Sequence, residues 1–230
     1  MLKNGSLFYS LQISIFVRFY NLKDFVRTAW NYYRNIEFAK IDLSLLWSYF
    51  WKSPYRMNRE LHLEPYGETP LCTMEKIAKI AAITAADTVF ELGCGRGRCA
   101  FWLAHFKKCK TVAIEYNPLF VARANQLKLH FQKAGDKSLE RLSFRLIDMK
   151  EADFHEATVL YLYGTLLSEQ DIQILAKKMS QLKSGVRIVT ISYALDEYLE
   201  KSTQGHILVT KEFEVEFCWG KTSAYLQVVV

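Results

Sequence analysis

The sequence lacks the features that mark disulfide-rich, zinc-binding and membrane-spanning proteins. Its five cysteines include no C-x-x-C pair, which argues against a disulfide framework or a zinc site and fits a reducing compartment. The apolar stretch from Leu7 to Tyr20 is interrupted by polar residues and is shorter than the roughly 20 residues that a spanning helix needs. No small-residue cleavage site follows it, so a secretory signal is not expected either. We therefore expect a cytoplasmic protein.

Two further absences limit which binding partners and which catalytic or metal-binding residues are expected. The chain has no arginine-rich run and no RNA-binding module, so nucleic acid is not an expected partner despite a formal charge of +6. The five histidines share no spacing, and we assign neither a catalytic base nor a metal site to them. The sequence does not indicate an oligomeric state.

The first 65 residues are basic and aromatic. They carry nine Lys and Arg against five Asp and Glu, and 15 of the 33 aromatic residues. From Asn21 to Asn35 apolar residues recur at helical spacing, and a second apolar cluster extends from Leu43 to Trp51. We expect two or three helices that pack against the main domain through their apolar faces and leave basic residues in solvent. Peripheral contact with an anionic membrane and capture of a substrate are alternatives.

The remainder of the chain, residues 66–230, predicts one α/β domain. Thr69 and Pro70 form a typical helix start, with Thr69 as the cap. The predicted strands are Thr88 to Leu92, Thr111 to Glu115, Leu142 to Ile147, Thr158 to Leu162 and Val186 to Ser192. The predicted helices between them are Arg98 to Phe106, Pro118 to Phe131 and Glu169 to Leu182. This alternation predicts a Rossmann-like, doubly wound, mostly parallel sheet, and the last 24 residues predict an antiparallel hairpin.

The most informative segment of the sequence is Glu91-Leu-Gly-Cys-Gly-Arg-Gly97, where a strand runs into a glycine-rich turn and then a helix. Glycine lets the backbone bend tightly and approach a ligand closely. Acids also end the next two predicted strands, at Glu115 and Asp148. Ligands of open α/β sheets bind beyond the carboxyl ends of the strands, so the three acids are expected at one site.

The type of nucleotide follows from the position of the acids. Glu115 lies 22 residues after Gly93, about the spacing at which an acid binds a ribose. A dinucleotide-binding turn reads G-x-G-x-x-G, whereas this chain has G-x-G-x-G after Glu91. An acid before the turn repels a pyrophosphate but attracts the ammonium of S-adenosylmethionine (SAM), which favours SAM as the cofactor.

These motifs resemble those of class I SAM-dependent methyltransferases, with Glu91 to Gly97 as the first motif and Ala113 to Pro118 as the second. With Tyr66-Gly-Glu-Thr-Pro70, the chain also resembles the lysine methyltransferases outside the SET class, particularly the group of the ATP-synthase c-subunit enzyme. The resemblance implies that Glu91 meets the methionine end, Glu115 the ribose, and Tyr116 and Asp148 the adenine. The residues it implies for cofactor binding are Tyr66, Glu68, Thr69, Glu91, Gly93, Cys94, Gly95, Gly97, Glu115, Tyr116, Asn117, Asp148 and Met149.

The acceptor side of the predicted site is less defined by sequence. Many enzymes that methylate amides or nucleobases carry Asn-Pro-Pro-Tyr after the fourth strand, whereas this chain has Tyr161-Leu-Tyr-Gly-Thr165. Aromatic rings suit an alkyl ammonium, so we expect a protein lysine as acceptor and assign Tyr161 and Tyr163 to the catalytic site. Because the two alternate on a strand, packing of either in the core is an alternative. The other functional alternatives are methylation of a small molecule or lipid head group, and a non-catalytic module that binds a partner.

Overall fold

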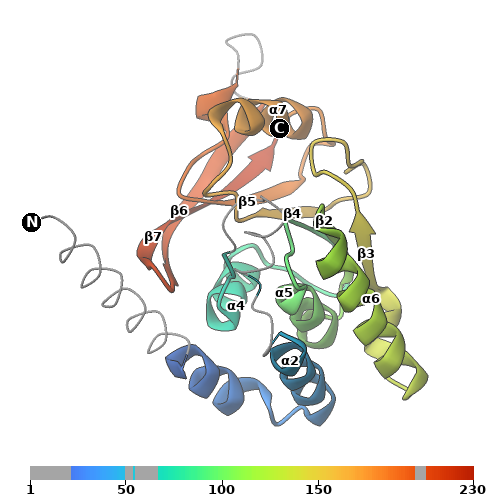
Figure 1. Cartoon of the computed structure of the whole chain (residues 1–230). Coiled ribbons are helices and arrows are strands. Elements are labelled where there is room, and N and C mark those ends of the chain that lie inside the picture. Colours follow the sequence, from blue (N-terminus) through green and yellow to red (C-terminus); the bar gives the residue numbers. More distant parts are fainter. Residues whose placement is uncertain (1–21, 50–53, 55–66, 200–205) are drawn as a thin grey trace, which may run out of the picture.

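The computed structural model describes residues 22–49, 54, 67–199 and 206–230. Its centre is a seven-stranded sheet with the order β3-β2-β1-β4-β5-β7-β6 (Figure 1). The strands are β1 (Thr88–Leu92), β2 (Lys110–Glu115), β3 (Leu142–Leu146), β4 (Val159–Leu162), β5 (Arg187–Ile191), β6 (Ile207–Phe217) and β7 (Gly220–Val229). The first five pair in parallel, and β7 pairs antiparallel with both β5 and β6. The predicted doubly wound sheet and its closing hairpin are thus confirmed.

Helices cover both faces of the sheet. They are α2 (Ile36–Ser48), α4 (Leu71–Ile80), α5 (Arg98–Trp102), α6 (Pro118–Lys133) and α7 (Glu169–Met179), with short helical turns at Leu103–Lys107, Lys137–Arg141 and Asp196–Tyr198. The side chains of Val89 and Tyr161 lie in the cluster with α2, α4, α5 and α6. Phe90 and Leu160 lie in the cluster on the other face, with α7. This alternation follows from the two-residue side-chain period of a strand.

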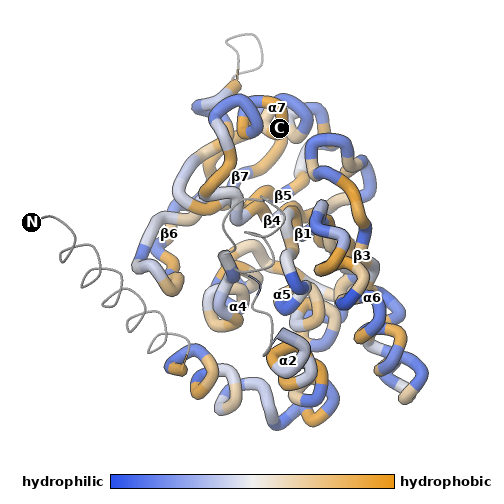
Figure 2. The backbone as a smooth tube through the Cα atoms, in the orientation of Figure 1, coloured by the Kyte–Doolittle hydropathy of each residue, from blue (hydrophilic) through white to orange (hydrophobic). Residues whose placement is uncertain are grey.

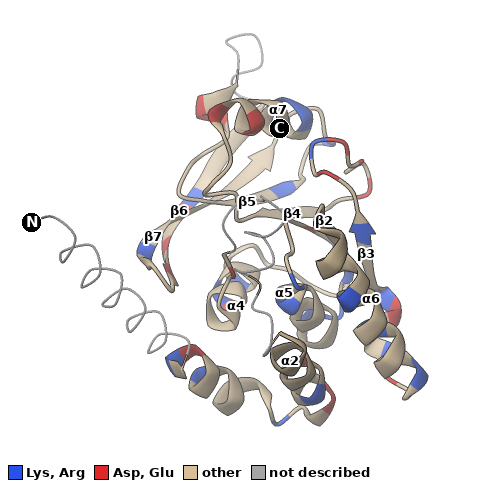
Figure 3. Ribbon diagram, viewed as in Figure 1, with Lys and Arg blue, Asp and Glu red and all other residues tan. Residues whose placement is uncertain are grey.

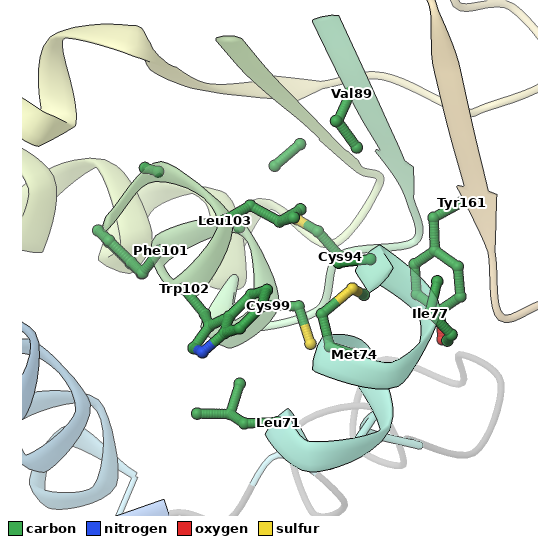
Figure 4. Close-up of a cluster of buried hydrophobic side chains, with 14 of the residues drawn as sticks. Leu71, Met74, Ile77, Val89, Cys94, Cys99, Phe101, Trp102, Leu103 and Tyr161 are labelled. Carbon is green, nitrogen blue, oxygen red and sulfur yellow. The ribbon is translucent and has the colours of Figure 1, made fainter. Parts of the chain in front are cut away.

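Helix α2 belongs to the hydrophobic core. Its side chains Phe38, Ile41 and Leu45 are at most 1% exposed and share one cluster with α4 and α5. Figure 4 shows part of that cluster, in which Leu71, Trp102 and Tyr161 come from different elements. Helix α2 and the α/β fold therefore share one hydrophobic core.

The predicted orientation of the first amphipathic helix is wrong. Residues 22–32 are helical, but Leu22, Val26 and Trp30 are 60%, 57% and 79% exposed. The buried residues of this helix are Thr28 and Tyr32, at 1% and 4% exposure. The apolar stripe thus faces solvent and a polar stripe faces the protein. Figure 2 shows the hydropathy of each residue along this segment.

Polar contacts explain this inverted orientation. The inward Tyr32 donates a hydrogen bond of 2.7 Å to Glu75 on α4. At the side of the helix, Lys23 and Arg27 lie 3.5 and 3.3 Å from the carboxylate of Glu216 on β6. The charges at the start of this helix are marked in Figure 3. Among the described residues, no helix has the length and apolar character needed to cross a membrane.

Candidate active site

The glycine-rich turn joins β1 to α5 with three residues in the left-handed region. Gly93, Gly95 and Gly97 have φ values of +74°, +55° and +82°. The backbone N–H groups of Gly93 and Cys94 both donate to the carbonyl of Ile114, at 2.9 Å each. The end of β2 thus holds the start of the turn. Side chains with a Cβ rarely adopt these φ values, which explains the glycines.

Gly97 also meets a close neighbour, and this leads to a prediction. A Cβ at Gly97 would lie 2.4 Å from a ring carbon of Phe144, whereas at Gly135, with φ +98°, nothing lies within 4 Å. Both alanine variants therefore bear backbone strain, but only Gly97→Ala adds a steric clash. We expect Gly97→Ala to lower the free energy of unfolding by about 1–3 kcal/mol more than Gly135→Ala does, measured by urea denaturation. Equal losses in the two variants would contradict the clash.

Glu91 places a buried carboxylate beside the turn. The residue is 5% exposed, and its Oε2 atom has no hydrogen-bond partner among the described residues. Burial, together with the charges of Glu68 and Glu115, raises the pKa of Glu91 from 4.5 to about 8. Such an acid favours a cationic ligand, because a positive charge stabilises a buried carboxylate whose Oε2 atom has no hydrogen-bond partner among the described residues.

Glu115 ends β2 and is held by backbone donors. Its Oε1 accepts hydrogen bonds from the N–H groups of Tyr116 and Asn117, at 3.0 and 2.8 Å, and its Oε2 accepts one from Gly95, at 2.8 Å. Burial raises the pKa of Glu115, and the three N–H groups oppose that rise. Asn117 is fully buried and caps α6 through the N–H of Leu119. The structure therefore brings Glu115 and the glycine turn together, while Tyr116 is 40% exposed.

Asp148 follows β3 and has a more open environment. Its side chain is 42% exposed, and its Oδ2 lies 3.7 Å from the ammonium of Lys150. Its other oxygen accepts a hydrogen bond of 2.8 Å from the backbone N–H of Lys150. The neighbouring Met149 lies over the turn, with its methyl group 3.4 Å from the position of a Cβ on Gly93. Both residues stay predicted cofactor contacts on the outer side of the site.

Glu68 and Arg96 form a two-pronged ion pair across the turn. The Nε and Nη2 atoms of Arg96 donate to the two carboxylate oxygens of Glu68, at 2.7 and 2.6 Å. Burial acts to raise the pKa of Glu68, but the Arg96 guanidinium outweighs it and holds that pKa below its usual range. The positive charge of Arg96 is thereby balanced next to the predicted cofactor site. Tyr66, the other residue predicted in this segment, lies outside the described residues.

Thr69 has a role that differs from the predicted one. Helix α4 begins at Leu71 with Pro70 as its N-cap, and no side chain caps it, so the expected cap at Thr69 is wrong. The Thr69 hydroxyl instead lies 2.6 Å from that of Tyr161. A helix cap would have joined neighbouring residues, whereas this contact joins residues 92 positions apart in the chain. It fixes the segment before α4 against the end of β4.

The two tyrosines predicted as catalytic sit at different depths. Tyr161 is 2% exposed, so it belongs to the core, yet it also lines a cavity of about 20 Å³ with Thr69, Glu91 and Gly93. Tyr163 lines the same cavity and is only partly buried. Burial raises the pKa of both phenols, most strongly that of Tyr161. Both hydroxyls are therefore protonated at neutral pH and do not act as bases.

Sequence reasoning missed two groups near this cavity. The first is Trp219, which donates a hydrogen bond of 2.7 Å from its indole nitrogen to the hydroxyl of Tyr163. The second is Arg98, which lines the cavity and binds Asp42 on α2 at 2.7 Å and Asp24 at 2.8 Å. The position of Trp219 in the predicted hairpin turn could have indicated its role from the sequence. Nothing local in the sequence pairs Arg98 with residues more than 50 positions away.

The chain is similar in sequence and in structure to known methyltransferases. The family model described as the ANTKMT methyltransferase domain matches residues 91–203. A protein-lysine N-methyltransferase of Saccharolobus islandicus is 30% identical over 132 residues, which cover 57% of this chain and 78% of the relative. Among solved structures, an RNA methyltransferase of Salinibacter ruber aligns with a TM-score of 0.56 and 24% identity, covering 70% of this chain and 93% of that one.

A second solved structure supports the same fold at lower identity. Geranyl diphosphate C-methyltransferase of Streptomyces coelicolor aligns with a TM-score of 0.52 and 12% identity, covering 69% of this chain and 78% of that one. At such identities the two structures show the fold only. The acceptors named for them, an RNA and geranyl diphosphate, differ in chemistry, so the fold alone does not indicate the acceptor.

Proposed function

Because the chain belongs to the family of protein-lysine N-methyltransferases, we propose that it transfers a methyl group from SAM to the Nε atom of a lysine in a protein. The observation that carries this proposal is the unpaired, buried carboxylate oxygen of Glu91, a residue that lines a small cavity together with Tyr161 and Tyr163. A cationic cofactor tail and an aromatic acceptor side thus share one site.

The residues of the site fit SAM. The Glu91 carboxylate complements the ammonium of the methionine tail, since its Oε2 atom lacks a partner. Glu115 keeps lone pairs for ribose hydroxyls, because its three backbone donors use only part of its acceptor capacity. The glycines of the turn let the backbone approach the ligand. When bound, SAM supplies a sulfonium methyl carbon that bonds to the lysine nitrogen as its bond to sulfur breaks.

The chain's own contribution is to position and desolvate the acceptor. A lysine nitrogen attacks only after it has lost its proton, and a dry, aromatic surrounding lowers the pKa of an ammonium. The rings of Tyr161 and Tyr163 supply such a surrounding on the β4 side of the cavity. The rate is then set largely by how well the two partners are oriented. No side chain of the site is assigned as a general base.

The proposal is tested by labelling. Purified protein is incubated with SAM carrying a radioactive methyl group and with a whole-cell extract, which is then separated into protein, organic and small-molecule fractions. The protein fraction is hydrolysed to amino acids. We expect the label in Nε-methyl-lysine, and none with the Glu91→Gln variant; mass spectrometry of the labelled band identifies the modified lysine. Label in the organic phase would indicate a lipid acceptor, and label in the small-molecule fraction a metabolite; either result in place of methyl-lysine would overturn the proposal.

We also propose that the outward faces of the N-terminal helices contact an anionic membrane surface. Six apolar side chains of these helices are at least 46% exposed: Leu22, Val26, Trp30, Ile36, Leu43 and Trp47. Two of the six are tryptophans, which favour the boundary between water and lipid. The first 65 residues also carry a net charge of +4, which attracts anionic head groups.

Sedimentation with vesicles tests this contact. The protein is mixed with vesicles of phosphatidylserine and phosphatidylcholine, or of phosphatidylcholine alone. We expect it to pellet with the first, and to stay in the supernatant after the triple change Leu22→Ser, Val26→Ser and Trp30→Ser. The control is Leu129→Ser, because Leu129 is 55% exposed but lies on α6. Equal pelleting of the triple variant and the control would contradict membrane contact through this face.

A further inference from the structure

The turn between β6 and β7 consists of Cys218 and Trp219 alone. Two-residue hairpin turns favour asparagine, aspartate and glycine, which tolerate the tight backbone. Trp219 is instead a large side chain that is 47% exposed. Turn formation does not require an indole here, and a residue that departs from local preference is often a functional one.

The contacts of Trp219 lead to the active site. Its ring stacks on Phe217, with centroids 5.4 Å apart and planes 5° apart. Phe217 in turn stacks on Tyr163, at 4.9 Å and 24°. The Trp219 indole also donates its hydrogen bond to the Tyr163 hydroxyl. These three residues, here called the aromatic wall, are stacked in one row from the exposed Trp219 through the buried Phe217 to Tyr163, which shares a cavity with Glu91.

The position of the aromatic wall matches the acceptor side of the site. Strand β4, which precedes Tyr163, borders β1 on one side, and β2, which ends in Glu115, borders it on the other. The residues predicted to bind the adenosine part follow β2 and β3. The β4 side, where the wall begins, is therefore the side that these residues leave to an acceptor.

The chemistry of the aromatic wall suits a lysine side chain. Aromatic faces attract an alkyl ammonium, tryptophan most strongly, and they cover its methylene groups as well. Close packing also limits the space: a Cβ on Gly67 would lie 2.5 Å from the Tyr163 ring, so backbone closes the wall on that side. The hairpin, residues 207–229, lies beyond the residues that match the family model, which end at 203.

We propose that Trp219 determines acceptor specificity by receiving the side chain of the target lysine against the aromatic wall. This inference rests on the proposed function. It assigns Trp219 to binding of the acceptor and not to binding of SAM, so the two affinities are expected to respond differently to its replacement.

Steady-state kinetics tests the assignment, with a peptide that spans the lysine identified by labelling. We expect Trp219→Ala to raise the KM for the peptide about 10- to 30-fold, the size typical for loss of a central aromatic contact, while the Kd for SAM stays unchanged. Trp219→Leu keeps an apolar side chain but removes the ring, and serves if the alanine variant does not fold. The control is Leu208→Ala at the other end of β6, where Leu208 is 46% exposed.

The outcomes separate the inference from the function on which it rests. If the wild-type protein methylates the lysine and both Trp219 variants keep its KM, the inference fails and the proposed function stands. If the Trp219 variants lose SAM affinity in parallel, Trp219 supports the cofactor site instead and the assignment is again overturned. If the wild-type protein labels no lysine at all, both fail together.

Discussion

Replacing Glu91 with glutamine is expected to remove SAM binding and, in the cofactor-free protein at pH 8.5, to raise the melting temperature. The affinity falls because the ammonium of the cofactor loses the buried carboxylate that we propose as its partner. Loss of one member of a buried, hydrogen-bonded charge pair costs about 2–5 kcal/mol, so we expect binding to weaken at least about 30-fold. Isothermal titration calorimetry with SAM measures this change.

The gain in stability follows from the raised pKa of Glu91. Its folded-state pKa of about 8 lies above the ordinary value of 4.5. Below pH 4.5 the carboxyl is protonated in both the folded and unfolded states, so the shift costs nothing. Between pH 4.5 and about 8 the unfolded state loses its proton first, and the folded state is increasingly penalised. Glutamine has no charge to bury, and it removes a penalty of roughly 3–5 kcal/mol at most.

The decisive measurement for Glu91 is the difference in stability between pH 5 and pH 8.5. The variant and the wild-type protein should differ little at pH 5, and the variant should be more stable at pH 8.5. Glu140→Gln is the control, because Glu140 is an exposed acid far from the turn in sequence. A Glu91→Gln variant that is less stable than wild type at pH 8.5 would show that the carboxylate is satisfied in the cofactor-free protein.

Replacing Asp42 with alanine is expected to cause the largest loss of stability among the variants considered. Asp42 is fully buried on α2 and binds Arg98 through two hydrogen bonds, of 2.7 and 3.1 Å. Burial acts to lower the pKa of Arg98, but the neighbouring carboxylates raise it above its usual value, so the guanidinium stays charged. Among the described residues, removing Asp42 leaves Asp24 as the one charged hydrogen-bond partner of this buried guanidinium.

The expected size of the loss is about 3–5 kcal/mol, or roughly 10 °C in melting temperature. Asp153→Ala is the matched control, since Asp153 pairs with His155 at the surface and is 71% exposed. The double variant Asp42→Ala, Arg98→Met should be more stable than Asp42→Ala alone, because it no longer buries a guanidinium that has lost its fully buried carboxylate partner. If Asp42→Ala loses no more stability than Asp153→Ala, the buried pair does not hold the N-terminal helices to the catalytic fold.

Much of the fold was predictable because its signals are local. Strand β1 begins and ends where the apolar run predicted, at Thr88 and Leu92, and the other parallel strands agree within two residues at each end. The side-chain periodicity of strands and the glycines at turns each depend on a few neighbouring residues, and the structure retains both. The glycine turn and the acids at the carboxyl ends of β1 and β2 meet for the same reason: parallel strands end at one edge of a sheet.

The site was less predictable where one residue depends on a distant one. The hydroxyl of Thr69 contacts Tyr161 in place of capping α4, and the hydroxyl of Tyr163 meets the indole of Trp219. Each bond joins segments more than 50 positions apart in the chain. No short window of sequence contains both partners, so spacing alone does not reveal them.

Local chemistry in the chain thus specified the α/β class, the glycine turn and the acids that suit a sulfonium cofactor. The orientation of the helix at residues 22–32 was settled by its neighbours. Its hydrophobic period predicts an apolar face turned inward, yet Asp24 and Thr28 turn inward to the buried guanidinium of Arg98. Breaking a buried ion pair costs several kcal/mol, and Asp24 and Thr28 contact Arg98 only with this face turned inward. A long-range contact, and not the hydrophobic period, therefore decided which face met the protein.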